Sequence, residues 1–185
     1  MSVKIIYFVH GTTTDNLEHK ASGWEQGQLS SKGIEQVLNL KEILKSNEII
    51  DFSKIDLVIS SDLKRAIDSA NYLFEGEKEI LHDERIRECN YGELSLKDNS
   101  LVKYEEHIEE PFPNGESLKD VEKRMKNFTN YLLEKYNGKT IALVAHKAPQ
   151  LALDVITKGM TWQEAIDSDW RKTKNWQPGW MYEIK

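Results

Sequence analysis

The chain has 185 residues, a net charge of −6 at pH 7, five histidines and a single cysteine, Cys89. Its length suits one domain over residues 1–185, and its negative charge argues against a nucleic-acid-binding surface. No apolar run approaches the roughly 20 residues of a membrane helix, and the N-terminal run lacks the flanks of a signal peptide. The lone cysteine excludes an internal disulfide, and the histidines lack metal-binding spacing. We therefore expect a soluble cytoplasmic protein with no metal, cofactor, nucleic-acid partner or membrane contact.

Strand and helix patterns alternate through the first half of the chain. Short apolar runs bounded by turn residues predict strands, and apolar residues three or four positions apart predict amphipathic helices. The expected elements are strands at 3–9, 55–60 and 79–82 and helices at 31–46 and 62–74. The polar loop 11–29 between the first strand and the first helix has a length typical of functional loops.

The second half continues the same alternation after an irregular, charged segment at 83–115 that we expect to cross the edge of the sheet. Ser117, with Asp120 three residues later, predicts the capped start of a helix. A strand is expected at 140–145 and a helix at 148–157. Strands separated by helices predict an α/β protein, a three-layer α/β/α sandwich with a mainly parallel central sheet.

Aromatic residues gather near the C-terminus. Tryptophan side chains bury large apolar areas, so packing of this tail across the sheet is the favoured interpretation. A partner interface or a lid over a pocket is the alternative. The residues are Trp162, Trp170, Trp176 and Trp180.

Two predicted strands are each followed by a histidine, His10 in one case and His146 in the other. If these strands are parallel neighbours, both imidazoles reach the edge of the sheet where open α/β sheets bind ligands. Each histidine taken alone is more often structural, and Arg65 by its position alone is a solvated helix residue. Together, however, the loops at this edge offer close backbone approach, neutral donors and a guanidinium, as a phosphoryl group requires. The candidate ligands are Gly11, Thr13, Asn16 and Arg65.

Five separate segments resemble, in order, the motifs of the histidine phosphatase superfamily, also called phosphoglycerate mutase-like. They are YFVHGTTTDN (7–16), SSDLKRA (60–66), RECNYGE (87–93), PNGESL (113–118) and VAH (144–146). Each segment is weak alone, but their order across nearly the whole chain makes the resemblance specific. It implies the phosphoglycerate mutase-like fold.

The resemblance also implies a role for each matching residue. His10 is expected to attack phosphorus and form a phosphohistidine, which suits an imidazole that is neutral at the working pH. Arg65 and His146, with Asn16 as a neutral donor, would bind and neutralise the phosphoryl oxygens. Glu88 would protonate the leaving oxygen and then deprotonate the attacking water. Without the resemblance, Glu88 would be interpreted as an exposed acid in an acidic stretch.

Two residues depart from the family's pattern. Val9 stands immediately before His10, where the family has an arginine, and Lys147 follows His146, where the family usually has glycine. We hypothesise that the Lys147 ammonium replaces part of the missing charge, while a lysine turned to water is the equal alternative. Trp24, in the long loop, is a hypothetical contact for the organic part of a substrate.

The sequence leaves three possible functions. The favoured one is a phosphatase that hydrolyses a small-molecule phosphomonoester. A phosphoglycerate mutase-type isomerase is the second, although segment 83–115 is too short and polar to build the lid that excludes water. A degenerate protein that binds phosphoesters without turnover is the third, because of Val9. The substrate and the oligomeric state stay open.

Overall fold

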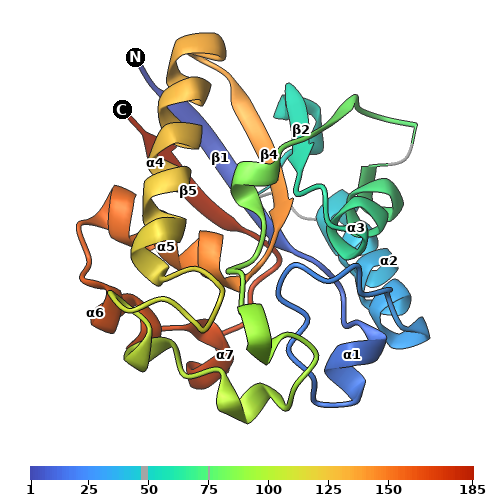
Figure 1. Cartoon of the computed structure of the whole chain (residues 1–185). Coiled ribbons are helices and arrows are strands. Elements are labelled where there is room, and N and C mark those ends of the chain that lie inside the picture. The colour runs from blue at the N-terminus through green and yellow to red at the C-terminus, as the bar shows by residue number, and fades with distance from the viewer. Residues whose placement is uncertain (47–49, 75) are drawn as a thin grey trace.

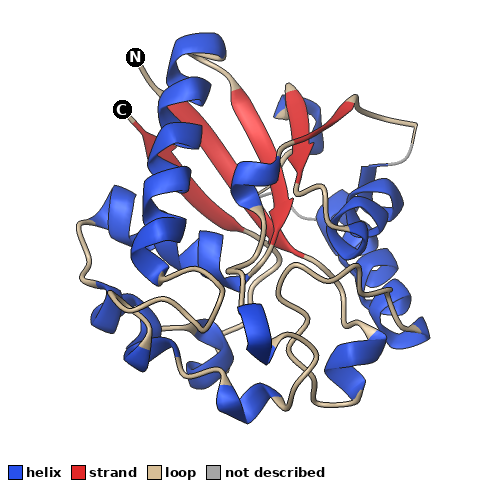
Figure 2. Cartoon of the chain, viewed as in Figure 1, coloured by secondary structure: helices blue, strands red, loops and turns tan. Residues whose placement is uncertain are grey.

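A five-stranded sheet with helices on both faces organises the chain in the computed structural model, which describes residues 1–46, 50–74 and 76–185 (Figures 1 and 2). The strand order is β3-β2-β4-β1-β5. The first four strands pair in parallel, and β5 runs antiparallel to β1. The strands are β1 Val3–Val9, β2 Leu57–Ser60, β3 Ile80–His82, β4 Thr140–Ala145 and β5 Trp180–Ile184. The predicted α/β sandwich with a mainly parallel sheet is confirmed.

The helices lie in two layers. α2 and α3 cover one face of the sheet, while α4 and α5 cover the other. α1, α6 and α7 are short and lie near the carboxyl ends of the strands (Figure 1). The helices are α1 Thr14–Leu17, α2 Ser31–Ser46, α3 Lys64–Phe74, α4 Leu118–Lys135, α5 Lys147–Lys158, α6 Trp162–Asp167 and α7 Trp170–Thr173. The predicted strand at 140–145 and helix at 31–46 are confirmed to the residue.

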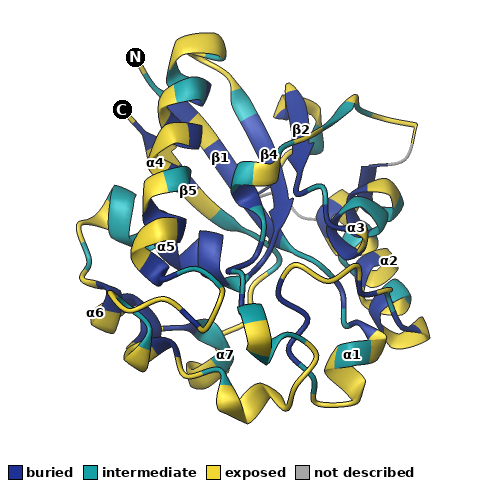
Figure 3. Cartoon of the chain, in the orientation of Figure 1, coloured by how far each residue is buried: buried dark blue, intermediate teal, exposed yellow. Residues whose placement is uncertain are grey.

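β1 is buried on both faces, which explains its continuous apolar run. Ile5 and Tyr7 belong to the core beneath α4 and α5, whereas Ile6 and Phe8 belong to the core beneath α2 and α3. Figure 3 shows the consequence: β1 and β4 are largely dark blue, and the outward faces of the helices are yellow. The sheet is therefore a rigid base for the loops at its carboxyl edge.

Some element boundaries differ from the prediction. The strand expected at 55–60 begins only at Leu57, because Asp51 caps a short 3-10 turn over Phe52–Lys54 and Ile55 ends that turn. Ser117 and Asp120 do form the expected capping box at the start of α4. The segment between β3 and α4 holds several 3-10 turns and passes the carboxyl ends of the strands (Figure 1).

The C-terminal elements were not predicted. β5 is an antiparallel edge strand whose burial alternates along the chain, and α7 has only four residues. Neither presents the long apolar pattern by which the other elements were found. Within the described ranges, none of the helices combines the length and the apolar character that spanning a membrane requires.

Candidate active site

The parallel register of β1 and β4 brings the two strand-end histidines together. Val9 pairs with Ala145, and the N–H of His10 donates to the carbonyl of Ala145 at 3.1 Å. The imidazole centroids of His10 and His146 lie 5.1 Å apart. The predicted convergence of these two rings at one edge of the sheet is thus present.

His10 presents a neutral imidazole with one nitrogen directed toward a cation. Its Nδ1 lies 2.7 Å from the carbonyl oxygen of Gly11, so Nδ1 carries the proton in this contact, and Arg65 Nε donates to Nε2 at 3.3 Å. Burial and then the positive charge of Arg65 lower the pKa of His10 to about 3. At neutral pH, Nε2 therefore keeps the lone pair that a nucleophile needs.

Arg65 is buried rather than solvated, with 2% of its surface exposed. Its Nη1 donates to the carbonyl of Glu25 at 2.8 Å and its Nη2 to the carbonyl of Gly23 at 2.7 Å. These two bonds from the long loop hold the planar guanidinium against His10. They leave further N–H groups of the guanidinium for a bound anion, since an arginine side chain has several donors.

His146 lies fully buried behind His10. Its backbone is held by Tyr7, whose hydroxyl donates to the His146 carbonyl at 2.7 Å and accepts from the His146 N–H at 3.0 Å. Neither ring nitrogen has a hydrogen-bond partner within the described parts of the chain. Burial, with added repulsion from Arg65 and His10, holds the pKa of His146 well below its usual value. A buried, unpaired polar group is costly, so a ligand oxygen that reached this ring would relieve that cost.

Glu88 is not the exposed acid that its sequence neighbourhood suggested, because only 7% of it is exposed. Its carboxylate lies at the N-terminus of α5, where Oε1 accepts the N–H of Ala148 at 2.9 Å and Oε2 accepts the N–H of Lys147 at 3.2 Å. Oε1 also accepts from the Cys89 N–H at 2.8 Å and the Tyr104 hydroxyl at 3.1 Å. Oε2, with fewer donors among the described contacts, is the oxygen better placed to exchange a proton with a ligand.

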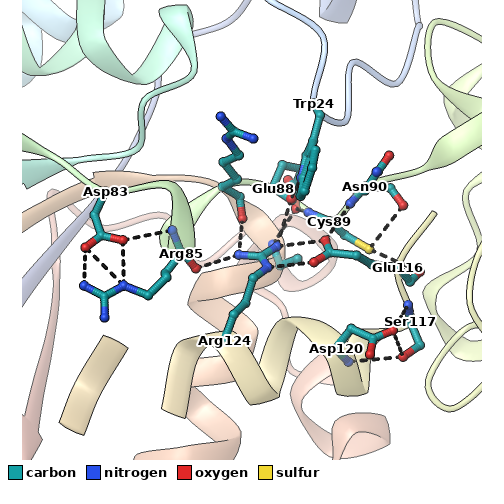
Figure 4. Close-up of polar contacts among 12 residues, drawn as sticks. Trp24, Asp83, Arg85, Glu88, Cys89, Asn90, Glu116, Ser117, Asp120 and Arg124 are labelled. Atoms are coloured by element: carbon teal, nitrogen blue, oxygen red, sulfur yellow. Dashed lines mark hydrogen bonds and ion pairs between the residues drawn. The ribbon is translucent and has the colours of Figure 1, made fainter. Parts of the chain in front are cut away.

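Arg124 of α4 holds the backbone around Glu88 by hydrogen bonds (Figure 4). It donates to the carbonyls of Arg85, Arg87 and Glu88 at 2.7, 2.8 and 2.9 Å. Its guanidinium also pairs with Glu116 at 2.9 Å. The charged segment that carries Glu88 is therefore fixed by an arginine that the sequence analysis did not single out.

Trp24 takes part in this support. Its Nε1 donates to the carbonyl of Glu88 at 2.7 Å, and the Arg87 guanidinium lies 4.9 Å from its ring centroid. Its side chain does not line the cavity described below. The indole N–H is thus used on the backbone of Glu88, while the substrate contact expected of the Trp24 ring stays a prediction.

The three candidate ligands in the loop after β1 differ in the contacts that they make within the protein. Thr13 is fully buried and caps α1, its Oγ1 accepting from the Asn16 N–H while Asn16 Oδ1 accepts from the Thr13 N–H, both at 3.0 Å. The N–H of Gly11 donates to Ser69 at 3.1 Å, and a Cβ on Gly11 would lie 2.5 Å from the carbonyl oxygen of Gly33. Gly11 thus allows close packing on α2, and Asn16, through its amide nitrogen, is the side chain left to meet a ligand.

A cavity of about 940 Å³ opens beside these groups. His146, Thr13 and Trp24 do not contribute to its lining. In the described ranges, no cluster of three or more His, Cys, Asp or Glu side chains could hold a metal ion. Of the predicted site residues, the cavity is lined by His10, Gly11, Asn16, Arg65, Glu88 and Lys147.

Two cations that line the same cavity, Lys147 and Arg171, share one buried carboxylate. The side chain of Asp169 is fully buried, and it pairs with Lys147 at 3.4 Å and with Arg171 at 2.9 Å. Lys147 lies 4.4 Å from the ring centroid of Tyr104, and both cations line the cavity. Sequence reasoning missed Arg171 and Asp169, because a four-residue helix gives no periodic signal. The one local signal is Asp169 as the N-cap of that helix.

Comparison with known proteins shows the family of the chain. A sequence model of the family described as "Histidine phosphatase superfamily (branch 1)" matches residues 6–174. The chain belongs to this superfamily. Solved structures with a similar fold include the alpha-ribazole phosphatase from Shigella flexneri. It aligns with a TM-score of 0.74 at 22% identity, over 90% of this chain and 84% of that one.

Related members of the superfamily carry different activities in their names. The chain is 26% identical to a 2,3-bisphosphoglycerate-dependent phosphoglycerate mutase of Bartonella tribocorum, over 91% of this chain and 88% of the mutase. It is 29% identical to phosphoserine phosphatase 1 of Hydrogenobacter thermophilus, over 82% of this chain and 74% of the phosphatase. Membership of the histidine phosphatase superfamily therefore indicates phosphoester chemistry without selecting a substrate.

Proposed function

We propose that the chain is a phosphatase that hydrolyses a small phosphomonoester through a phosphohistidine on His10. The observation that carries this proposal is the neutral imidazole whose Nε2 faces the guanidinium of Arg65 at 3.3 Å. A nucleophilic nitrogen beside a fixed cation is the pairing that transfer of a phosphoryl group requires. The Glu88 carboxylate in the same cavity provides the group that can move a proton.

The proposed reaction proceeds in two steps. In the first, His10 Nε2 forms a bond to phosphorus as the bond from phosphorus to the ester oxygen breaks, and that oxygen takes a proton from Glu88. The proton enters with the substrate, since a phosphomonoester has a second pKa of about 6. In the second, water attacks phosphorus, Glu88 accepts a proton of that water, and the bond to His10 breaks. Inorganic phosphate then takes this proton from Glu88 and leaves, so that neutral His10 and the Glu88 carboxylate are regenerated.

Arg65, His146 and Asn16 would hold the phosphoryl oxygens during both steps. We infer that Val9 occupies the position where the family carries an arginine, so one guanidinium is missing next to His10. Lys147 and Arg171, with Asp169 between them, together carry one net positive charge at the cavity wall. This pair would replace part of the missing charge, because charge at the phosphoryl oxygens needs a nearby cation.

Release of inorganic phosphate from a panel of sugar phosphates, nucleotides and phosphoglycerates tests the proposal, with His10→Ala as the control. Acid-labile phosphate on His10 in the wild type, absent in the variant, would support the covalent step. The test also separates the alternatives: turnover that depends on a bisphosphoglycerate primer would identify a mutase. Tight phosphate binding with no phosphohistidine would identify a protein that binds without turnover.

A further inference from the structure

The cavity holds much more than a phosphoryl group. Ligand pockets for drug-sized molecules measure about 300–1,000 Å³, and this one measures about 940 Å³. Beyond the residues of the reaction, a large part of its lining comes from the C-terminal segment, which contributes Trp170, Trp176, Pro178 and Trp180. We call Trp170, Trp176 and Trp180 the tryptophan wall.

Two members of the tryptophan wall are held in place. The rings of Trp170 and Trp180 stack with centroids 5.2 Å apart and an interplanar angle of 27°. The Arg171 guanidinium lies 4.4 Å from the ring centroid of Trp170. Trp180 is also fixed through β5, where it pairs with Tyr7 of β1. Contacts within the protein therefore hold this part of the tryptophan wall.

Trp176, by contrast, exposes 53% of its surface while lining the cavity. An aromatic ring left in water beside a cavity can gain stability by packing against a ligand. One face of α2 also lines the cavity, with Leu40 and the 39% exposed Ile43. Apolar surface thus lines the cavity from two separate elements.

The distance between the tryptophan wall and the nucleophile fits one ligand that touches both. Trp180 pairs with Tyr7, and His10 lies three residues further along the same strand direction. At about 3.4 Å per residue, the backbone of Trp180 lies roughly 10 Å from that of His10 along the strand direction. A phosphomonoester with a ring-bearing organic group spans a distance of this order, whereas a phosphoglycerate does not fill it.

We propose that the tryptophan wall binds the organic group of the substrate, and that this group is a flat aromatic ring system. The inference rests on the proposed phosphatase function and names its substrate class: phosphomonoesters of alcohols that carry an aromatic ring. Trp176 is the residue that determines this specificity, because it is the wall member with the most surface free for a ligand ring.

Binding of non-hydrolysable phosphonates tests the inference apart from catalysis. We would titrate naphthylethyl, propyl and carboxyethyl phosphonate into the wild type by calorimetry. The expected result is that naphthylethyl phosphonate binds at least tenfold more tightly than the other two, as a stacked and buried ring predicts. Equal affinities, no binding of any of the three, or tightest binding of carboxyethyl phosphonate would overturn it.

Three variants assign the effect to the tryptophan wall. Trp176→Ala should weaken binding of naphthylethyl phosphonate about tenfold and leave propyl phosphonate unchanged, while Trp176→Phe should retain most of the affinity. Met181→Ala is the matched control, because Met181 is 59% exposed, lies on β5 and does not line the cavity. An equal loss in Met181→Ala, or no loss in Trp176→Ala, would contradict the proposal. If these phosphonates bind as expected but no phosphomonoester is hydrolysed, the phosphatase function fails, and the tryptophan wall remains a binding site for phosphoesters that carry an aromatic ring.

Discussion

His10 and His146 follow neighbouring parallel strands, and their imidazole rings lie 5.1 Å apart with an interplanar angle of 58°. Burial lowers the pKa of both rings, so the two meet as neutral groups beside the charged Arg65. The negative charge of a phosphoryl group would favour the protonated form of His146 and leave His10 to attack. In the proposed reaction, the same two strands would therefore carry a nucleophile and a charge-stabilising group.

Replacement of His10 by alanine should abolish turnover while the fold persists. The variant lacks the nitrogen that would bond to phosphorus, whereas the backbone contact to Ala145 needs no side chain. We expect phosphate release to fall on the order of a thousandfold or more. Rate measurements paired with circular dichroism check this, and a folded variant that keeps a comparable rate would show that His10 is not the nucleophile.

The stability of the protein should fall as the pH drops from about 6.5 toward 3. The pKa of His10 is about 3 in the fold, against 6.5 for an ordinary histidine. Between these values the unfolded chain binds a proton that folded His10 does not, so the free energy of unfolding decreases with falling pH. One such proton contributes a slope of up to about 1.4 kcal/mol per pH unit, and burial of His146 acts in the same direction.

Denaturant unfolding at several pH values measures this slope. His10→Gln should flatten it, because the titrating imidazole is removed. His19→Asn is the control: His19 is exposed and has a φ of 56°, which asparagine tolerates. A slope that His10→Gln leaves unchanged would contradict the assignment.

The sequence predicts a site residue only where the neighbouring residues in the chain carry a signal for it. His10 and His146 were found because strands buried on both faces are continuous apolar runs, and both runs end at a histidine. Glu88 carried no such signal, and only the family resemblance singled it out. Its burial depends on the N–H groups of Lys147 and Ala148, which lie about sixty residues later in the chain. No pattern around residue 88 reveals that contact.

The positions of the C-terminal tryptophans likewise depend on contacts between residues that are distant in the sequence. The sequence analysis favoured packing of the tryptophans across the sheet, and Trp162 is indeed buried, with its Nε1 donating to Glu122 at 2.8 Å. Trp170, Trp176 and Trp180 line the cavity, and Trp180 also packs against the core. Their place follows from the pairing of β5 with β1, a long-range contact that alternating burial in a five-residue edge strand does not predict.

Glu88→Gln should slow esters of poor leaving groups more than esters of good ones. An alkoxide needs a proton as it leaves, whereas a nitrophenolate does not, and positioned proton transfer contributes about a hundred- to ten-thousandfold. We expect kcat for an alkyl phosphate to fall by that order and kcat for nitrophenyl phosphate to fall much less. Equal losses for both esters would show that Glu88 acts only through position.

Trp24→Phe should lower kcat for every substrate by a similar, several-fold factor. The variant keeps an aromatic ring beside Arg87 but loses the hydrogen bond from Nε1 to the carbonyl of Glu88, a contact of 2.7 Å. A neutral hydrogen bond of this kind contributes about 0.5–1.5 kcal/mol. Kinetics on alkyl and aryl phosphates check the prediction. A change confined to KM of one substrate class would instead return Trp24 to the role of a substrate contact.

Removal of either cation beside Asp169 should weaken phosphate binding. Lys147→Met and Arg171→Met each take one positive charge from the cavity wall and leave the buried Asp169 carboxylate with one partner. We expect the Kd for inorganic phosphate to rise about tenfold in each variant, and the effects in the double variant to be non-additive, because both residues share Asp169. Lys172→Met is the matched control, since Lys172 neighbours Arg171 but does not line the cavity. Calorimetry at several salt concentrations measures these changes. If only Lys172→Met weakened phosphate binding, or if no variant changed it, Lys147 and Arg171 would not replace the missing arginine.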